Sequence, residues 1–67
     1  MAKIQLNGKK VMISSNYSLS DLLKKYNLLN RKVAIEYNGI IVPKEDFKKK
    51  LLKNNDKVEI VHFIGGG

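Results

Sequence analysis

Alternating polar and apolar positions open the chain and predict a β-hairpin. Ile4 and Leu6 alternate with polar neighbours, and Asn7-Gly8 is a two-residue turn signal. The alternation resumes at Val11 and Ile13. Asparagine and glycine tolerate the positive φ angles that such tight turns require. We therefore predict two antiparallel strands whose apolar side chains face the core.

A polar stretch followed by regularly spaced apolar residues predicts the main helix. Ser18 and Asp21 have the spacing of a capping box, which satisfies free backbone N–H groups at the start of a helix. Tyr17 precedes the cap and is placed to pack on Leu22 as a hydrophobic staple. Four residues recur at helical spacing and predict one buried stripe: Leu19, Leu22, Leu23 and Tyr26.

A second hairpin follows the helix, and proline ends it. Residues 31–37 are predicted to form a strand, Asn38-Gly39 is another tight-turn signal, and residues 40–42 form a short return strand. Pro43 has no backbone N–H group and therefore ends the pairing.

The connection to the last strand is predicted to contain one helical turn. Phe47 and Leu51 are four residues apart, so a helical turn would bring both side chains onto the core. Residues 54–56 then form a turn, and the last strand begins near Lys57.

The last strand divides its side chains between the two faces of the sheet. Val58 and Ile60 share one face, while Val61 and Phe63 share the other. A single helix covers only one face, so the second face is predicted to be open. The alternative is a bulge that shifts the register and turns Val61 and Phe63 inward. With an open face, we expect a partner-docking patch formed by Ala34, Val61, Phe63 and Ile64.

The net charge raises the question of nucleic acid binding, but the distribution of the charge argues against it. The 67-residue chain has a formal charge of +7, and twelve of its thirteen basic residues are lysine. The lysines are scattered, with no aromatic residues between them as a base-stacking platform. Solvated surface lysine ranks first, electrostatic steering toward acidic protein partners second, and nucleic acid third.

Length and composition indicate one small domain. A hydrophobic content of 43% in 67 residues is enough for a single core. Without cysteine, the chain has no disulfide framework, no thiolate metal site and no cysteine nucleophile. No apolar run reaches the roughly 18 residues that span a membrane, and the first residues lead directly into a strand. We expect a cytoplasmic protein without membrane contact that is a monomer on its own.

Three glycines, Gly65, Gly66 and Gly67, end the sequence and are its strongest candidate for chemistry. Glycine has no side chain, so the tail offers its backbone and an unhindered carboxylate. Extended, Ile64 through Gly67 would reach roughly 10 to 14 Å, enough for Gly65 and Gly66 to thread the active site of a partner. The alternatives are an inert, frayed end or an engineered glycine scar.

The other polar residues do not form a catalytic pattern. His62 is the single histidine and has no neighbouring ligands for a metal site or partners for a triad. No pair of carboxylates has a spacing that suggests acid–base work. We therefore predict no metal site, no catalytic residue and no enzymatic activity. The protein would be a cosubstrate on which enzymes act.

Several of these segments together resemble the ThiS family, the sulfur carriers of thiamine biosynthesis. The resemblance lies in residues 33–47, with their Asn-Gly-x-x-Val-Pro turn, in residues 56–61, and in the glycines at 65–67. It implies an α+β, ubiquitin-like β-grasp fold, with a four- to five-stranded mixed sheet and one main helix on one face. The first and last strands would pair in parallel at the sheet centre. Residues 1–64 would form the domain and residues 65–67 a flexible diglycine-type tail.

The resemblance also implies how sulfur is carried without cysteine. In the family, a ThiF-type adenylyltransferase uses ATP to join the terminal glycine, here Gly67, to AMP. A persulfide donor, such as a cysteine desulfurase system, then replaces the AMP and leaves a 1-thioglycine thiocarboxylate. Thiazole synthase, ThiG, would receive the sulfur. No cofactor is expected to remain bound.

Two other kinds of function stay open at this point. The same terminal glycine would serve a molybdopterin-synthase small subunit (MoaD-like) or a ubiquitin-related modifier that is conjugated to lysines. The short length and the Asn-Gly-x-x-Val-Pro pattern favour the thiamine branch. A small basic nucleic-acid-binding domain is the alternative from a different class.

Overall fold

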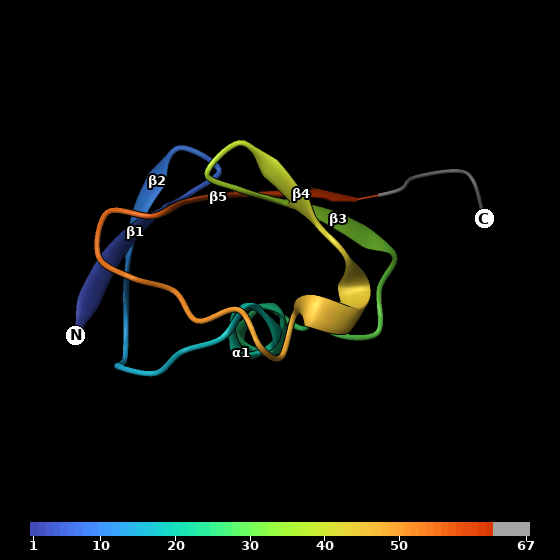
Figure 1. The fold of residues 1–67 in the computed structure, drawn as a ribbon, viewed down its shortest axis with the longest axis horizontal. Helices are drawn as coiled ribbons and strands as arrows, with labels where there is room; N and C mark the ends of the chain where they lie inside the picture. Colours follow the sequence, from blue (N-terminus) through green and yellow to red (C-terminus); the bar gives the residue numbers. More distant parts are fainter. Residues whose placement is uncertain (63–67) are drawn as a thin grey trace.

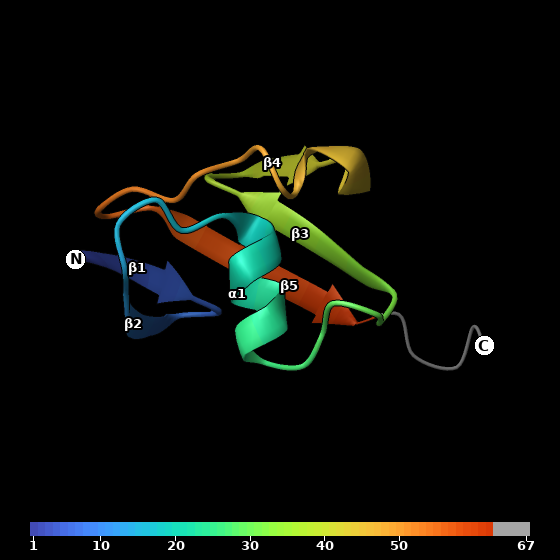
Figure 2. The same ribbon diagram turned by 90° about the horizontal axis from the view of Figure 1, so that it is seen from below.

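Five strands form one mixed sheet, and helix α1 packs against one face of it (Figures 1 and 2). The computed structural model describes residues 1–62. The elements are β1 (Ala2–Leu6), β2 (Lys9–Ile13), α1 (Leu19–Lys25), β3 (Val33–Tyr37), β4 (Ile40–Val42), the 3₁₀ helix η1 (Lys44–Asp46) and β5 (Lys57–His62). The predicted α+β architecture is confirmed. The predicted boundary at residue 64 lies outside the described residues.

Strand β5 lies at the centre of the sheet, whose strand order is β2-β1-β5-β3-β4. It runs parallel to β1, with Gln5 opposite Lys57 and Leu6 opposite Val58. On its other side it runs antiparallel to β3. The central parallel pair of first and last strands, which the family resemblance implied, is therefore confirmed.

Both Asn-Gly pairs form the predicted tight turns. Asn7 and Gly8 have φ angles of 48° and 82°, and Asn38 and Gly39 have φ angles of 49° and 88°. Positive φ at both central residues is characteristic of the type I′ turn, whose twist matches that of the flanking strands. A Cβ atom added at either glycine would meet nothing within 4 Å, so the backbone angle, and not lack of space, favours glycine there.

The start of helix α1 has the predicted capping box. The Ser18 hydroxyl accepts a hydrogen bond from the Asp21 backbone N–H at 3.0 Å, and the Asp21 carboxylate accepts one from the Ser18 backbone N–H at 2.9 Å. Leu19, Leu22 and Leu23 are buried, as their spacing predicted. The capping box satisfies two backbone donors that the helix itself cannot pair.

The prediction that Tyr26 completes the buried stripe is wrong. Helix α1 ends at Lys25, and Tyr26 is its C-terminal cap, with 41% of its surface exposed. Asn27 then has a φ of 59°, so the backbone leaves the right-handed helical conformation there. Leu28, whose backbone N–H donates to the Leu23 carbonyl at 2.8 Å, packs against the core there. The helix therefore ends one residue before the position that would have continued the stripe.

The prediction that Leu51 packs on the core is also wrong. Phe47 is buried as predicted, but Leu51 is 45% exposed and Leu52 is buried instead. The helical turn η1 ends before this point, and Leu51 forms an isolated antiparallel bridge with Ser18. In extended backbone, neighbouring side chains point in opposite directions, so the helical spacing of four no longer applies.

The core lies between the sheet and α1. Its buried members come from β1, β2, α1, β3, β5 and the connection after η1: Ile4, Ile13, Leu19, Leu22, Leu23, Ile35, Phe47, Leu52, Val58 and Ile60. Val58 and Ile60 point inward, while Val61 on the same strand is 56% exposed. The alternative register, in which Val61 turns inward, is therefore wrong.

Candidate functional site

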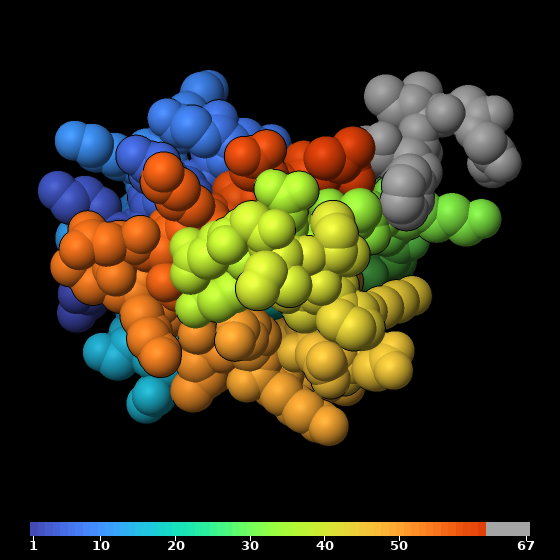
Figure 3. All heavy atoms as spheres, turned by 45° about the horizontal axis from the view of Figure 1, so that its top comes forward, coloured from blue at the N-terminus to red at the C-terminus, as the bar shows by residue number. Residues whose placement is uncertain are grey.

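The open face of the sheet is the side of the molecule that α1 leaves uncovered (Figure 1). Strands β5, β3 and β4 contribute Val61, Ala34 and Ile41 to it, because these residues alternate with the inward-facing ones on each strand. Figure 3 shows this side obliquely, with β5 in red between β2 in blue and β4 in yellow-green. We refer to this surface as the open face.

Two residues of the predicted docking patch meet on the open face. Ala34 of β3 lies directly opposite Val61 of β5. Ala34 is half-buried and Val61 is exposed, so the pair presents an apolar surface to solvent. The other predicted members, Phe63 and Ile64, and the tail residues Gly65, Gly66 and Gly67, lie outside the described residues.

Strand β4 adds an apolar residue that the sequence reasoning did not assign to the patch. Ile41 lies opposite Glu36 of β3 and is 61% exposed. The sequence pattern of residues 40–42 predicts only a short return strand and assigns Ile41 to neither face. The alternation of β3, together with the two-residue turn, could have placed Ile41 on the same face as Ala34.

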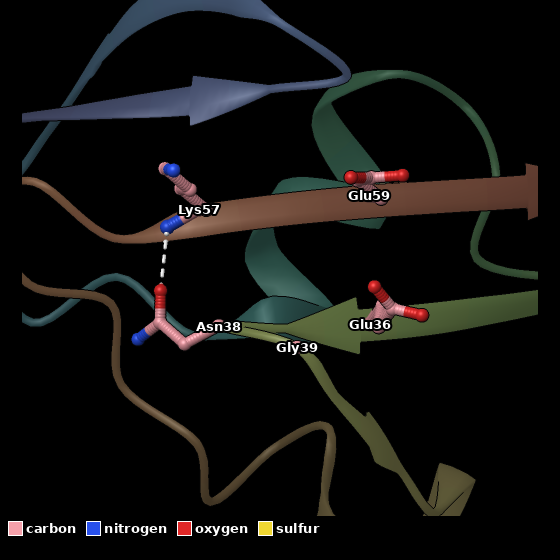
Figure 4. A pocket seen from close by; sticks show the side chains of 5 residues that line it. All are labelled: Glu36, Asn38, Gly39, Lys57 and Glu59. Carbon is pink, nitrogen blue, oxygen red and sulfur yellow. Dashed lines mark hydrogen bonds between the residues drawn. The ribbon is translucent and has the colours of Figure 1, made fainter.

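Two carboxylates face each other across strands β3 and β5. Glu36 is directly opposite Glu59, and together with Asn38, Gly39 and Lys57 they line an open hollow of about 390 Å³ (Figure 4). Figure 4 marks one hydrogen bond among these five residues, from the Lys57 backbone N–H to the Asn38 side-chain oxygen at 2.8 Å, and neither glutamate takes part in it. Like charges directly opposite each other destabilise a sheet. The pair is invisible in the sequence, because only the strand register brings the two residues together.

A buried carboxylate ties the second hairpin to the start of β5. Asp56 accepts hydrogen bonds from the Tyr37 hydroxyl at 2.6 Å, from the Lys53 backbone N–H at 2.7 Å and from the Asn38 amide at 3.1 Å. Burial alone would raise the pKa of Asp56, but these hydrogen bonds outweigh burial and lower it. Burial, the hydrogen bond to Asp56 and its negative charge raise the pKa of Tyr37 to about 12. The sequence predicted only a turn at Asp56, so this network is a further feature that it did not reveal.

The described residues show neither a metal cluster nor a membrane span. Within residues 1–62, no group of three or more His, Cys, Asp or Glu side chains is placed to hold a metal ion. In the same part of the chain, no helix is both long and apolar enough to cross a membrane. What the site offers chemically is an apolar and acidic surface on the strand that leads to the glycine tail.

Comparison with known proteins gives a consistent result. Residues 3–67 match the ThiS family. The chain is 43% identical over 65 residues to the sulfur carrier protein ThiS of Bacillus subtilis strain 168, covering 96% of this chain and 98% of that protein. A crystal structure of the thiamine biosynthesis protein ThiS from Geobacter metallireducens superposes with a TM-score of 0.82 at 28% identity, covering 97% of this chain and 99% of that one.

A third relative is much longer than this chain. It is a thiazole synthase of Paramagnetospirillum magneticum strain AMB-1, which is 40% identical over 65 residues. The match covers 97% of this chain but 20% of that protein. A segment similar to nearly all of this chain is therefore part of a longer protein named thiazole synthase.

Proposed function

The chain belongs to the ThiS family, and from this membership we propose that it carries sulfur for thiamine biosynthesis as a thiocarboxylate on Gly67. The family match and the structural match support a small sulfur carrier protein of thiamine biosynthesis with a β-grasp fold. The observation that carries the proposal is the 43% identity to a ThiS sulfur carrier over 98% of that protein.

The chemistry proposed for Gly67 proceeds in three steps. An adenylyltransferase joins the carboxylate to the AMP part of ATP and releases pyrophosphate. The carbonyl carbon of Gly67 then carries AMP, a good leaving group, in place of the carboxylate oxygen, a poor one. A persulfide then attacks the carbonyl carbon, releases AMP and forms an acyl disulfide. A thiol reduces the S–S bond and leaves the thiocarboxylate. Every bond change lies on backbone atoms, so the chemistry needs no cysteine in this chain.

The open face is proposed as the surface on which the enzymes dock. Ala34, Val61 and Ile41 supply exposed apolar area, and Val61 lies on the strand that leads to the tail. The same strand is anchored below the face, because Val58 and Ile60 are buried. A rigid β5 would therefore present the tail in a fixed direction to an enzyme that binds the open face.

Thiazole synthase is proposed as the acceptor of the sulfur. The similarity of this chain to a segment of a thiazole synthase from Paramagnetospirillum magneticum supports the assignment. When two functions share one chain in one organism, separate chains that perform them elsewhere are expected to meet. The adenylyltransferase and the persulfide donor rest on the family resemblance alone.

An intact-mass measurement tests the proposal. Incubated with a ThiF-type adenylyltransferase, ATP, a persulfide donor and a thiol, the protein should gain the difference in mass between one sulfur and one oxygen atom. Removal of Gly67, or addition of an alanine after it, should prevent the gain. An unchanged mass beside a control carrier that is converted by the same enzymes would refute the proposal.

A further inference from the structure

A groove on the opposite side of the molecule from the open face has an apolar lining and a positive charge, neither of which the reactions at Gly67 require. It lies between α1, η1 and the loop that leads into β3, and its volume is about 810 Å³. Its apolar lining includes Leu23, Phe47 and Leu29. Leu23 and Phe47 are also core residues, while Leu29 is 42% exposed. We refer to this surface as the basic groove.

Backbone hydrogen bonds hold the walls of the basic groove in place. The Ser20 N–H donates to the Phe47 carbonyl at 3.0 Å, which joins α1 to the segment after η1. On the loop side, the Arg31 N–H donates to the Leu28 carbonyl at 3.0 Å. The groove is therefore preformed, and a partner would spend little free energy on ordering it.

The rim of the basic groove is strongly cationic. Four basic residues line it, Arg31, Lys32, Lys44 and Lys48, against one acidic residue, Glu45, so its local charge is +3 (four minus one). Arg31 is the single arginine in a chain with twelve lysines. The guanidinium group binds carboxylates with two parallel hydrogen bonds, which lysine cannot do. An apolar floor with a cationic rim complements a segment that has an apolar side chain between carboxylates.

The basic groove also lies close to the end of the sheet from which the tail continues. Val33 lines the groove, and it is paired in the sheet with His62, the last residue that the structure describes. An enzyme that holds the tail must therefore approach this end of the molecule. This step rests on the proposed function.

We propose that the basic groove docks an acidic segment with an apolar side chain on thiazole synthase. The open face and the basic groove would then both contact the enzyme, one on each side of the sheet near the end of β5. A nucleic acid is the other polyanion to consider, but it favours exposed aromatic rings for stacking, and the one aromatic residue of the groove, Phe47, is 6% exposed.

Zero-length cross-linking of the unmodified protein to thiazole synthase tests the groove directly. A carbodiimide activates carboxylates of the enzyme, and a lysine that touches them forms an isopeptide bond. Mass spectrometry should find cross-links from Lys32, Lys44 or Lys48 to Asp or Glu residues of the enzyme. Cross-links confined to lysines outside the groove, such as Lys9 and Lys25, would overturn the inference. So would loss of the groove cross-links on addition of a single-stranded oligonucleotide but not of an acidic peptide.

A matched pair of variants separates the groove from the overall charge. Arg31→Gln/Lys44→Gln and the control Lys9→Gln/Lys25→Gln lower the net charge equally, and all four positions are exposed. We expect the groove variant to weaken binding to thiazole synthase about tenfold or more and the control less than about twofold. Equal effects would reduce the role of the groove to general charge and overturn the inference. Wild-type protein that carries a thiocarboxylate but transfers no sulfur to thiazole synthase would instead overturn the proposed function.

Discussion

Single asparagine side chains fix how β5 joins the rest of the sheet. The Asn7 amide oxygen accepts from the Ile60 N–H at 2.7 Å, and its amide nitrogen donates to the Ile60 carbonyl at 3.1 Å. Asn38 accepts from the Lys57 N–H at 2.8 Å. Each asparagine side chain makes hydrogen bonds with the β5 backbone that a neighbouring strand would make, at a point where the chain turns away. An Asn-Gly pair predicts the turn, but the same asparagine also pairs with backbone more than fifteen residues away.

Asp56 should make the stability of the fold depend on pH in the acidic range. Its folded-state pKa is below its ordinary value, so its contribution is complete above the pKa of the unfolded chain and is lost as the pH falls through the folded pKa. We expect the free energy of unfolding to decline below about pH 4. In Asp56→Asn it should be lower at neutral pH by about 1 to 3 kcal/mol and should vary less with pH.

Urea unfolding between neutral and acidic pH measures both effects. Glu45→Gln removes an exposed carboxylate outside this network and is the matched control. If Asp56→Asn retained the acid sensitivity of the wild type, carboxylates other than Asp56 would be responsible for it.

At the scale of elements, the alternation of β5 separates stability from docking. Ile60 is 8% exposed and Val61 is 56% exposed, although they are neighbours. Val61→Asp should cost about 1 kcal/mol of stability or less and should weaken binding to the adenylyltransferase and to thiazole synthase. Ile60→Asp buries a charge and should destabilise the fold by several kcal/mol.

Thermal unfolding and binding, measured on the same preparations, check this separation. A Val61→Asp protein that binds both enzymes as tightly as the wild type would remove Val61 from the docking surface.

The pairing of β3 with β5 predicts that substitutions at Glu36 and Glu59 stabilise the fold, in contrast to those at Val61 and Ile60. Because they lie directly opposite each other, replacing one with glutamine should raise the free energy of unfolding by about 0.2 to 1 kcal/mol. The double variant should add little to the single one, since one substitution already removes the repulsion. The gain should shrink at high salt, where the repulsion is screened.

A double-mutant cycle in urea unfolding measures this coupling. Two independent gains that simply add would show that the carboxylates do not repel each other in the folded protein.

At the scale of the whole molecule, body and tail are predicted to have separate roles. The described core draws on residues from Ile4 to Ile60, all upstream of the glycines. Deleting residues 65–67 should therefore change the free energy of unfolding by less than about 0.5 kcal/mol and abolish thiocarboxylate formation. Circular dichroism with intact-mass analysis reports both. A deletion that unfolds the protein would show that the tail belongs to the fold.

Local sequence patterns were sufficient for the strands, both tight turns and the capped helix start. In the turns and the helix start, the interacting residues are close neighbours in the chain, as in Leu6 with Lys9 or Ser18 with Asp21, whereas each strand was identified from its own alternation and not from its partners. Helix and strand periodicity also identified most of the core. The ThiS resemblance then supplied the parallel pairing of the first and last strands, which periodicity alone could not provide.

The tertiary structure was needed wherever distant segments meet or an element ends early. Tyr26 and Leu51 were misplaced because helical spacing was extended past the point where α1 and η1 stop. The Glu36–Glu59 pair, the Asp56 network and the basic groove join residues that are separated by up to dozens of positions. Chain periodicity records which face a side chain occupies, whereas register and packing decide which side chain it meets there.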